Sequence, residues 1–401
     1  MTQGEQVGAL WSWLLAQGVH IHFAHRTFAW SNEARGKAAV HCVIIGFGLH
    51  DLPGKIIYEY ADIKGEPTAV PASNINPYLV DAPNVVLPRR SKPMGDVPQI
   101  GIGNKPIDDG NYLFSTEERD AFIALEPASA KWFRRWLGAD EFLNGYERWC
   151  LWLGDTPPAA LRAMPEAMKR VQAVKKFRSA SKSPPTQKLA ATPTRFHVEN
   201  MPTTPYLVLP EVSSERRQFV PFGFEQPSTF CSNLVKMAAD ATLFHFGILS
   251  STMHNAWVRA VCGRLESRYR YSAAIVYNNF PWPFTAAEAE EKTPVATQMQ
   301  KAQAAIEAAA QAVLDARAAH PGSSLADLYD PLTMPANLRK AHQKLDAAVD
   351  KAYQLAGGRK TYASDAERVA FLFTLYQRHT SLLASAPAAK TPRRPRKAAA
   401  A

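Results

Sequence analysis

The hydrophobic pattern at the start of the chain predicts one helix followed by three strands. Between residues 5 and 17, apolar side chains recur at the i, i+3, i+4, i+7 spacing of a helix packed on one face, and Gly18 stands where a C-terminal cap is expected. Strand-like runs follow at residues 19–23, 38–45 and 55–60. The second run is almost continuously apolar, which is typical of a strand covered on both faces. So few elements predict the last part of an α/β domain with an exposed sheet edge.

The composition and hydrophobic pattern of the middle of the chain, residues 73–285, predict a loop-rich α+β domain. Prolines and glycines interrupt it up to about residue 155, and a short helix is expected near 115–125, begun by Ser115 or Thr116. A basic helix is expected at residues 158–182, with Pro165 either kinking it or marking its start. Its basic residues are Arg162, Lys169, Arg170, Lys175, Lys176 and Arg178. A solvated face and a phosphate-contacting element are equally good interpretations of this helix.

The last part of the chain is rich in alanine and predicts an all-α unit at residues 286–384. Leu338, Leu345, Val349 and Tyr353 make one apolar face of a helix in this unit. The remaining residues, 385–401, are expected to form a disordered basic tail. The pattern thus predicts four segments, with the end of an α/β domain at 1–72, the α+β domain at 73–285, the helical domain and the tail.

The charge balance favours an anionic partner. Lysine and arginine number 46 against 36 aspartate and glutamate residues, for a formal net charge of +10. Such an excess is typical of nucleic-acid binding proteins. No apolar run is long enough to span a bilayer, and the N-terminus lacks the pattern of a signal peptide, so we expect a soluble, cytoplasmic protein with no membrane partner.

No metal site or disulfide framework is expected. The four cysteines lie far apart without ligand-like spacing: Cys42, Cys150, Cys231 and Cys262. His20, His22 and His25 are crowded, but no carboxylate or cysteine stands near enough in the sequence to complete a site, so we expect them to be structural or exposed.

Several longer motifs, in the same order, resemble those of the Type IIL (MmeI-like) DNA methyltransferases. The motifs are Thr2–Gly8, Phe28–Gly46, Val212–Arg217, Trp257–Leu265 with Arg268–Ser272, and Tyr277–Pro283. The resemblance covers residues 2–380. It implies a site-specific adenine-N6 methyltransferase of a restriction-modification system, which uses S-adenosylmethionine and has a catalytic domain, a target-recognition domain and a helical C-terminal domain.

The resemblance also implies a fold class. Residues 1–72 would be the last helix and strands of a Rossmann-like methyltransferase sheet, followed by the α+β target-recognition domain and the all-α C-terminal domain. The chain departs from the family pattern, because it has no glycine-rich loop after a first strand and no Asn-Pro-Pro-aromatic tetrad. The nearest strings, Asn74–Tyr78 and Gly46–Gly48, are interpreted as turns. We therefore expect no catalytic residue and no bound cofactor in this chain alone, and a separate chain carrying the N-terminal methyltransferase half as its possible partner.

Double-stranded DNA is the partner that these motifs predict. Arginine suits bidentate contact with guanine, and glutamate can accept a hydrogen bond from a cytosine amine. The candidate DNA-binding residues are Arg216, Arg217, Arg259, Arg264, Glu266, Arg268, Arg270, Tyr271 and Ser272. For any one arginine, binding to phosphate or to an internal carboxylate is the competing interpretation.

Phe28 and Trp30 are the candidates for stacking on a flipped target base. A base-modifying enzyme must take its target base out of the duplex, and aromatic faces can hold it there. We place both residues in the turn before the strand at residues 38–45, where related enzymes put such an aromatic. Packing against the sheet edge is the alternative for both. Two other functions are weighed for the chain: a stand-alone sequence-specific DNA-binding protein without enzymatic activity, and a general binder of RNA or single strands.

Overall fold

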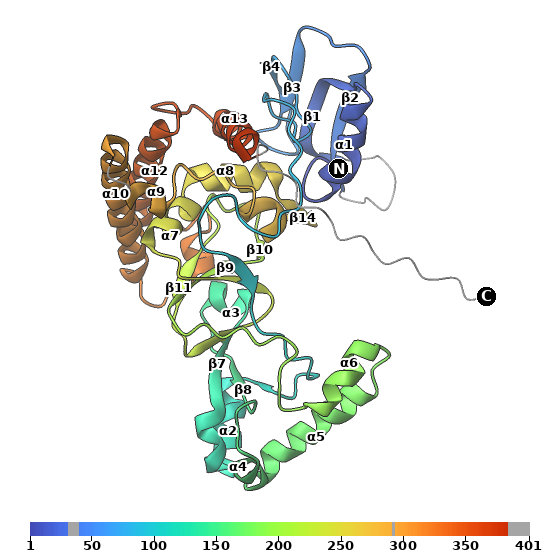
Figure 1. The fold of residues 1–401 in the computed structure, drawn as a ribbon, viewed down its shortest axis with the longest axis vertical. Coiled ribbons are helices and arrows are strands. Elements are labelled where there is room, and N and C mark those ends of the chain that lie inside the picture. Colours follow the sequence, from blue (N-terminus) through green and yellow to red (C-terminus); the bar gives the residue numbers. More distant parts are fainter. Residues whose placement is uncertain (31–39, 291–292, 384–401) are drawn as a thin grey trace, which may run out of the picture.

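The computed structural model describes residues 1–30, 40–290 and 293–383 (Figure 1). Four small sheets and a set of helices make up this part of the chain. The predicted tail at residues 385–401, and the middle of the Phe28–Gly46 motif at residues 31–39, lie outside the described residues.

The N-terminal unit is one helix beside a four-stranded sheet. Its elements are α1 (Gln6–Ala16), β1 (His20–Trp30), β2 (Val40–Gly48), β3 (Lys55–Glu59) and β4 (Thr68–Ala72). The strand order is β2-β1-β3-β4, with β1 and β3 parallel and the other pairs antiparallel. Gly18 has a φ of +76°, as a glycine that ends a helix should.

Two expectations about this sheet were wrong. The first strand does not end at Phe23 but runs to Trp30, so Phe28 and Trp30 lie on β1 and pair with Cys42 and Val40. Strand β2 is not covered on both faces: it lies at the end of the described sheet, and Phe47 is 54% exposed. The apolar run looked buried because sequence spacing carries no information about which neighbours a strand has in space.

The region after the first sheet holds three more sheets. Their orders are β11-β9-β13-β5, β12-β7-β8-β6 and β10-β15-β14. The strands are β5 (Ile100–Ile102), β6 (Leu113–Phe114), β7 (Phe133–Leu137), β8 (Trp149–Leu151), β9 (Tyr206–Pro210), β10 (Val212–Ser213), β11 (Gly223–Glu225), β12 (Thr229–Cys231), β13 (Val235–Ala239), β14 (Gly263–Leu265) and β15 (Arg268–Arg270).

Short helices connect and cover these sheets. They are α2 (Thr116–Leu125), α3 (Ala139–Asn144), α4 (Pro158–Arg162), α5 (Pro165–Ser179), α6 (Pro184–Lys188), α7 (Leu243–Ser250) and α8 (Thr252–Val261), with 3-10 turns at Pro127–Trp132 and Leu189–Ala191 and a π-helical turn at Ala273–Tyr277. Ser115 begins α2: its hydroxyl accepts from the Glu118 amide, and the Glu118 carboxylate accepts from the Ser115 amide. Pro165 marks the start of α5, so the single basic helix expected at 158–182 is two helices.

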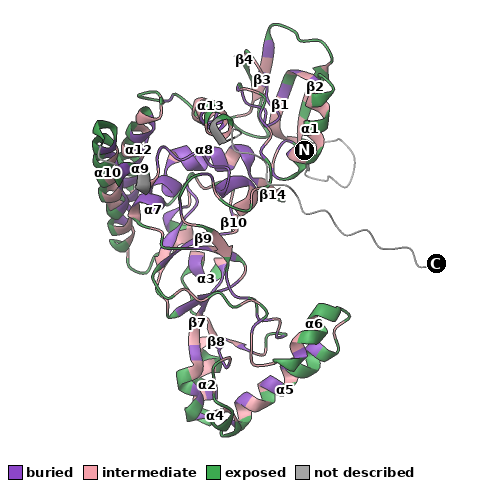
Figure 2. Ribbon diagram, viewed as in Figure 1, coloured by how far each residue is buried: buried purple, intermediate pink, exposed green. Residues whose placement is uncertain are grey.

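The C-terminal helices share one core with α7 and α8. They are α9 (Ala286–Glu290), α10 (Pro294–Ala318), α11 (Leu325–Leu328), α12 (Ala336–Leu355) and α13 (Asp365–Leu383). The rings of Trp257 on α8 and Phe373 on α13 lie 5.2 Å apart. Gly247 lets α7 approach α10, since a Cβ there would lie 2.6 Å from a methyl carbon of Ile306. Figure 2 shows that α7 and α8 are almost wholly buried. Strands β14 and β15 follow α8 directly in the chain, so they are attached to a well-packed helix.

Candidate nucleic-acid interface

The β14–β15 hairpin presents three exposed charged residues of the predicted DNA-binding set, Glu266, Arg268 and Arg270. Glu266 and Ser267 connect the two strands, and Glu266 has the positive φ, +58°, that tight hairpin turns require. Arg268 and Glu266 form a 2.8 Å ion pair, with side chains 45% and 76% exposed. Exposed pairs of this kind contribute little stability. Both side chains can therefore exchange their mutual contact for a polar ligand at low cost.

Arg270, the next outward-facing arginine on β15, is held by a half-buried carboxylate. Its Nε donates to Glu211 at 3.0 Å, and Lys236 donates to the other oxygen of Glu211 at 2.7 Å. Burial raises the pKa of the Glu211 carboxyl, but the hydrogen bonds and charges of Lys236 and Arg270 outweigh it, so that pKa lies below its usual value. The Arg270 side chain is still 61% exposed. The result is a guanidinium that is fixed in orientation but accessible.

Glu211 and Lys236 were missed by the sequence argument. They come from the chain just before β10 and from β13, far from the arginine-rich segment in the sequence. No motif marks them, because only the pairing of β10 with β15 brings Glu211 beside Arg270.

Two of the predicted DNA-binding arginines are engaged inside the protein. Arg259 pairs with Asp365 at 2.8 Å and donates to the carbonyl oxygen of Gln218. Arg264 donates to the Gln3 side chain and to the carbonyl oxygen of Ser267, and its guanidinium lies 4.0 Å from the centre of the Tyr269 ring. These contacts hold both guanidinium groups within the protein, and a DNA contact by Arg259 or Arg264 stays a prediction.

Tyr271 and Ser272 also make hydrogen bonds within the protein. The Tyr271 side chain is 2% exposed and its hydroxyl bonds to Nε2 of His254 at 2.9 Å. The Ser272 hydroxyl accepts from the amide of Ile275 and begins the π-helical turn. The prediction that Tyr271 faces DNA does not fit this burial, because a core side chain has no surface to offer a base.

Arg216 and Arg217 lie in the turn that follows β10. Arg216 is exposed, and its amide donates to the Ser214 hydroxyl at 3.3 Å. Arg217 is half-buried, with the carboxylate of Asp330 as a nearby charge, and burial lowers the pKa of its guanidinium. Of these two, Arg216 offers the accessible charge.

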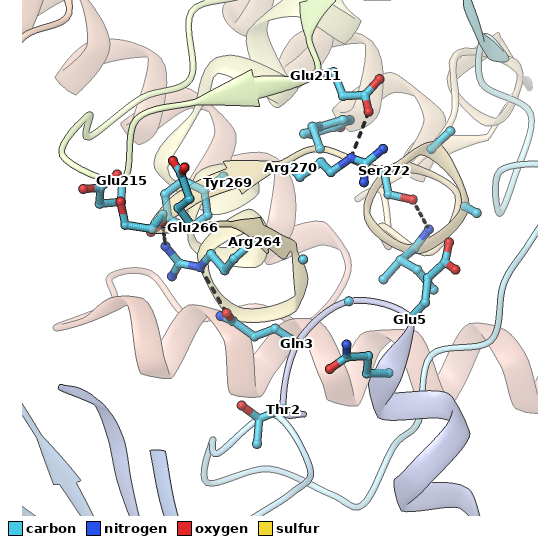
Figure 3. Close-up of a pocket in the computed structure, with 18 of the residues that line it drawn as sticks. Thr2, Gln3, Glu5, Glu211, Glu215, Arg264, Glu266, Tyr269, Arg270 and Ser272 are labelled. Carbon is cyan, nitrogen blue, oxygen red and sulfur yellow. Dashed lines mark hydrogen bonds and ion pairs between the residues drawn. The ribbon is translucent and has the colours of Figure 1, made fainter. Parts of the chain in front are cut away.

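The hairpin and the N-terminal sheet line one open cavity of about 1150 Å³ (Figure 3). Arg264, Glu266 and Arg270 of the β14–β15 hairpin line one part of the cavity. Thr27 of β1 and His41 of β2 line another part. In Figure 3 the side chains of Gln3, Arg264 and Glu266 lie around this space, with Glu211 next to Arg270. A ligand in the cavity would touch both the hairpin and the sheet end.

Phe28 and Trp30 stand at the same end of the sheet but differ in exposure. The Phe28 ring stacks on Tyr60, with centroids 5.1 Å apart and an interplanar angle of 16°. Tyr60 is held in turn by a 2.9 Å bond between its hydroxyl and Nδ1 of His25. Trp30, whose ring centroid lies 6.2 Å from that of Phe28, is 51% exposed. Phe28 thus belongs to a fixed aromatic stack, and Trp30, tilted by 52° against Phe28, lies next to that stack and is exposed to solvent.

Within the described ranges, no cluster of three or more histidine, cysteine, aspartate or glutamate side chains has the arrangement of a metal site. The four cysteines are free thiols. None of the helices in the described part of the chain is long and apolar enough to span a membrane.

Comparison with known proteins gives three consecutive family matches. Residues 1–59 match the MmeI DNA-methyltransferase domain, residues 81–284 the MmeI target recognition domain, and residues 298–384 the MmeI C-terminal domain. The chain is 39% identical over 380 residues to DNA methyltransferase A of Bacillus subtilis (strain 168), covering 95% of this chain and 41% of that protein. A structure of the Type IIL restriction-modification enzyme MmeI in complex with DNA matches with a TM-score of 0.83 and 52% identity over 95% of this chain and 48% of that one.

These matches, together with the end of an α/β sheet beside an arginine-bearing hairpin, define a protein built from DNA-methyltransferase and target-recognition domains. The chain belongs to the MmeI family of Type IIL restriction-modification enzymes. It spans less than half the length of both relatives. The predicted fold class is confirmed: the end of a methyltransferase sheet, an α+β target-recognition domain and a helical C-terminal domain.

Proposed function

We propose that this chain is the DNA-recognising portion of a site-specific adenine-N6 DNA methyltransferase that uses S-adenosylmethionine. Within it, residues 1–72 supply the end of the catalytic sheet, residues 73–285 recognise the target, and residues 286–384 support the recognition domain. The hairpin carries this proposal: its exposed Arg270 and Glu266 line the same cavity as the end of the β1–β2 sheet, and the exposed Arg268 pairs with Glu266.

The hairpin side chains have the chemistry of direct base readout. A guanidinium can donate two parallel hydrogen bonds to O6 and N7 of guanine, and a carboxylate can accept from the N4 amine of cytosine. Arg270 is suited to this because Glu211 and Lys236 hold its orientation before any ligand arrives. Arg268 and Glu266 form a second pair that separates on binding, and the exposed Arg216, which follows the cavity-lining Glu215, adds a phosphate contact.

The N-terminal sheet would hold the flipped base. An adenine that leaves the duplex next to the hairpin enters the cavity bordered by Thr27 and His41, with Trp30 as the exposed aromatic of the adjacent stack. Phe28, already stacked on Tyr60, would fix the position of Trp30 instead of contacting the base itself.

Methyl transfer by the 401-residue chain alone is not part of the proposal. The sequence contains no Asn-Pro-Pro-aromatic tetrad and no glycine-rich loop that follows a first strand. We propose that the cofactor is bound by the N-terminal half of a methyltransferase domain, supplied by a separate polypeptide. Incubation with labelled S-adenosylmethionine and DNA should give no labelled DNA from the chain alone and labelled DNA once that half is added; labelling by the chain alone would contradict the proposal.

The readout is tested on duplexes selected from a random library by the purified chain. Arg268→Ala and Arg270→Ala should each weaken binding to the selected duplex about 5- to 150-fold, the equivalent of one lost base contact, and relax selection at one position. Arg359→Ala is the matched control, because Arg359 is an exposed arginine paired with a glutamate in the helical domain. An equal loss on every duplex would make the two hairpin arginines phosphate contacts. Failure to select any sequence would contradict duplex recognition altogether.

A further inference from the structure

Helices α5 and α6 form an arm, residues 165–188, that projects from the lobe built on the β12-β7-β8-β6 sheet. Figure 1 shows the arm at the end of the molecule opposite the N-terminal sheet, reaching out on the same side as β14. Figure 2 shows that much of its surface is exposed. None of the base-contacting candidates lies on it, so it has no part in the readout proposed above.

One buried arginine fixes the arm to the lobe. The side chain of Arg178 is 0% exposed and donates five hydrogen bonds, all to backbone carbonyl oxygens. The acceptors are Pro106, Ile107, Leu189, Thr192 and Arg195. Ala167, Val171 and Val174 pack on the same inner face of α5. The outer face of the arm is therefore held in one orientation, and the basic residue predicted as a possible phosphate contact at position 178 serves as its anchor.

The outer face carries positive charge with no carboxylate to balance it. Lys175, Lys176, Lys182 and Lys188 are all exposed, and none of them makes an ion pair within the described part of the chain. From Val171 to Val198 the sequence contains no aspartate or glutamate. Lys169, six residues before Lys175 on α5, differs because it pairs with Glu166 at 2.6 Å.

Unpaired lysines spread over a rigid surface suit a polyanion whose charges are also spaced out. A lysine ammonium is a compact point charge without the planar donors that read base edges, and it binds phosphate independently of sequence. The α5 helix alone is roughly 22 Å long at 1.5 Å per residue, which covers several phosphates of a duplex strand.

We propose that the arm contacts the phosphates of duplex DNA that flanks the recognised bases. The inference rests on the proposed function, since it requires the hairpin to hold a duplex, and it adds a second contact away from the hairpin. Because these contacts are made to phosphate, they add affinity and salt dependence and leave the choice of sequence unchanged.

The test compares the full chain with a fourfold variant, Lys175→Gln, Lys176→Gln, Lys182→Gln and Lys188→Gln. Binding to the selected duplex and to a scrambled duplex of the same length is measured between 50 and 200 mM salt. We expect the slope of log affinity against log salt to become shallower by roughly 0.9 per lost phosphate contact, with the same fractional loss on both duplexes. On a duplex trimmed to the selected bases, the variant should bind like the unmodified chain.

The matched control removes the same charge from the helical domain. Lys301, Lys340, Lys344 and Lys351 are exposed on α10 and α12, and changing all four to glutamine leaves the arm intact. A salt slope that changes equally in both fourfold variants, or in neither, overturns the arm contact. The arm contact is also overturned if the arm variant shows a shallower salt slope on duplex RNA but not on duplex DNA. If the unmodified chain selects no sequence, the proposed function fails; if selection persists while the slope is unaltered by the arm variant, only this inference fails.

Discussion

The Nε atom of Arg264 donates a hydrogen bond to Oε1 of Gln3 at 3.1 Å. The amide nitrogen of the same glutamine donates to the carbonyl oxygen of Arg259 at 2.8 Å. Gln3 precedes α1 of the N-terminal unit, and the two arginines flank the junction of α8 with β14. One glutamine therefore joins the sheet that bears Trp30 to the hairpin that bears Arg268.

Replacing Gln3 by alanine should loosen this junction. We expect Gln3→Ala to lower the free energy of unfolding by about 1–2 kcal/mol, because two hydrogen bonds are lost. Hydrogen exchange at the Gly4 amide, which bonds to the carbonyl oxygen of Val261, should become faster. Gln6→Ala is the control, since Gln6 is exposed on α1. Equal effects of the two substitutions would mean that Gln3 does not connect the two units.

Gly4 allows the closest backbone approach at the same junction. Its φ is +67°, and a Cβ on it would lie 2.9 Å from Cα of Gly263. Gly4→Ala should therefore destabilise the protein by at least about 2 kcal/mol in thermal or denaturant unfolding, because backbone strain and a steric clash add together. Gly54→Ala isolates the strain, since Gly54 has a φ of +73° with nothing within 4 Å. The expectation is wrong if Gly4→Ala costs no more than Gly54→Ala.

Substitution of Arg178 should lower the stability of the lobe built on the β12-β7-β8-β6 sheet more than most other substitutions there. Arg178→Met keeps the approximate length of the side chain but removes five hydrogen bonds to backbone carbonyl oxygens from a fully buried position, so we expect a loss of about 3–5 kcal/mol. Faster hydrogen exchange confined to α5 and its neighbours would locate the effect. Lys176→Met, two residues earlier and exposed, should change stability by less than about 0.5 kcal/mol. Similar losses in the two variants would refute the anchoring role.

His342 should make the helical core sensitive to acid. Burial, helped by the Arg317 charge, lowers the pKa of His342 to about 3. Between its usual pKa near 6.5 and that value, the unfolded chain binds a proton that the folded chain does not. Stability should therefore fall as the pH falls through this window, by about 1.4 kcal/mol per pH unit for this group.

His342→Phe should flatten that acid dependence in urea unfolding measured from pH 7 to pH 4. Arg317 donates to the Tyr329 hydroxyl at 2.7 Å, so His342→Phe removes the acceptor that this hydroxyl has in His342 at 2.8 Å. The lost hydrogen bond lowers stability at every pH and leaves the expected flattening unchanged. Tyr329→Phe retains the histidine and should retain the steep dependence. An unchanged slope in His342→Phe would assign the acid sensitivity to other groups.

Local signals in the sequence were reliable where the structure depends on local chemistry. The spacing of apolar residues located α1, and Ser115 with Glu118 located the start of α2. The Arg268–Ser272 motif led to the segment that carries the exposed hairpin arginines. These features depend on side chains a few residues apart, and periodicity and capping preferences describe such neighbours directly.

Contacts between distant parts of the chain could not be predicted in this way. The charge partners of the arginines came from different distances along the chain: Arg259 pairs with Asp365, 106 residues away, whereas Arg268 pairs with Glu266, two residues away. The sequence by itself determined the order of the segments, their main helices and the family motifs. Only the tertiary structure decided which charges stay accessible, because exposure and pairing follow from how separate elements pack and not from their spacing along the chain.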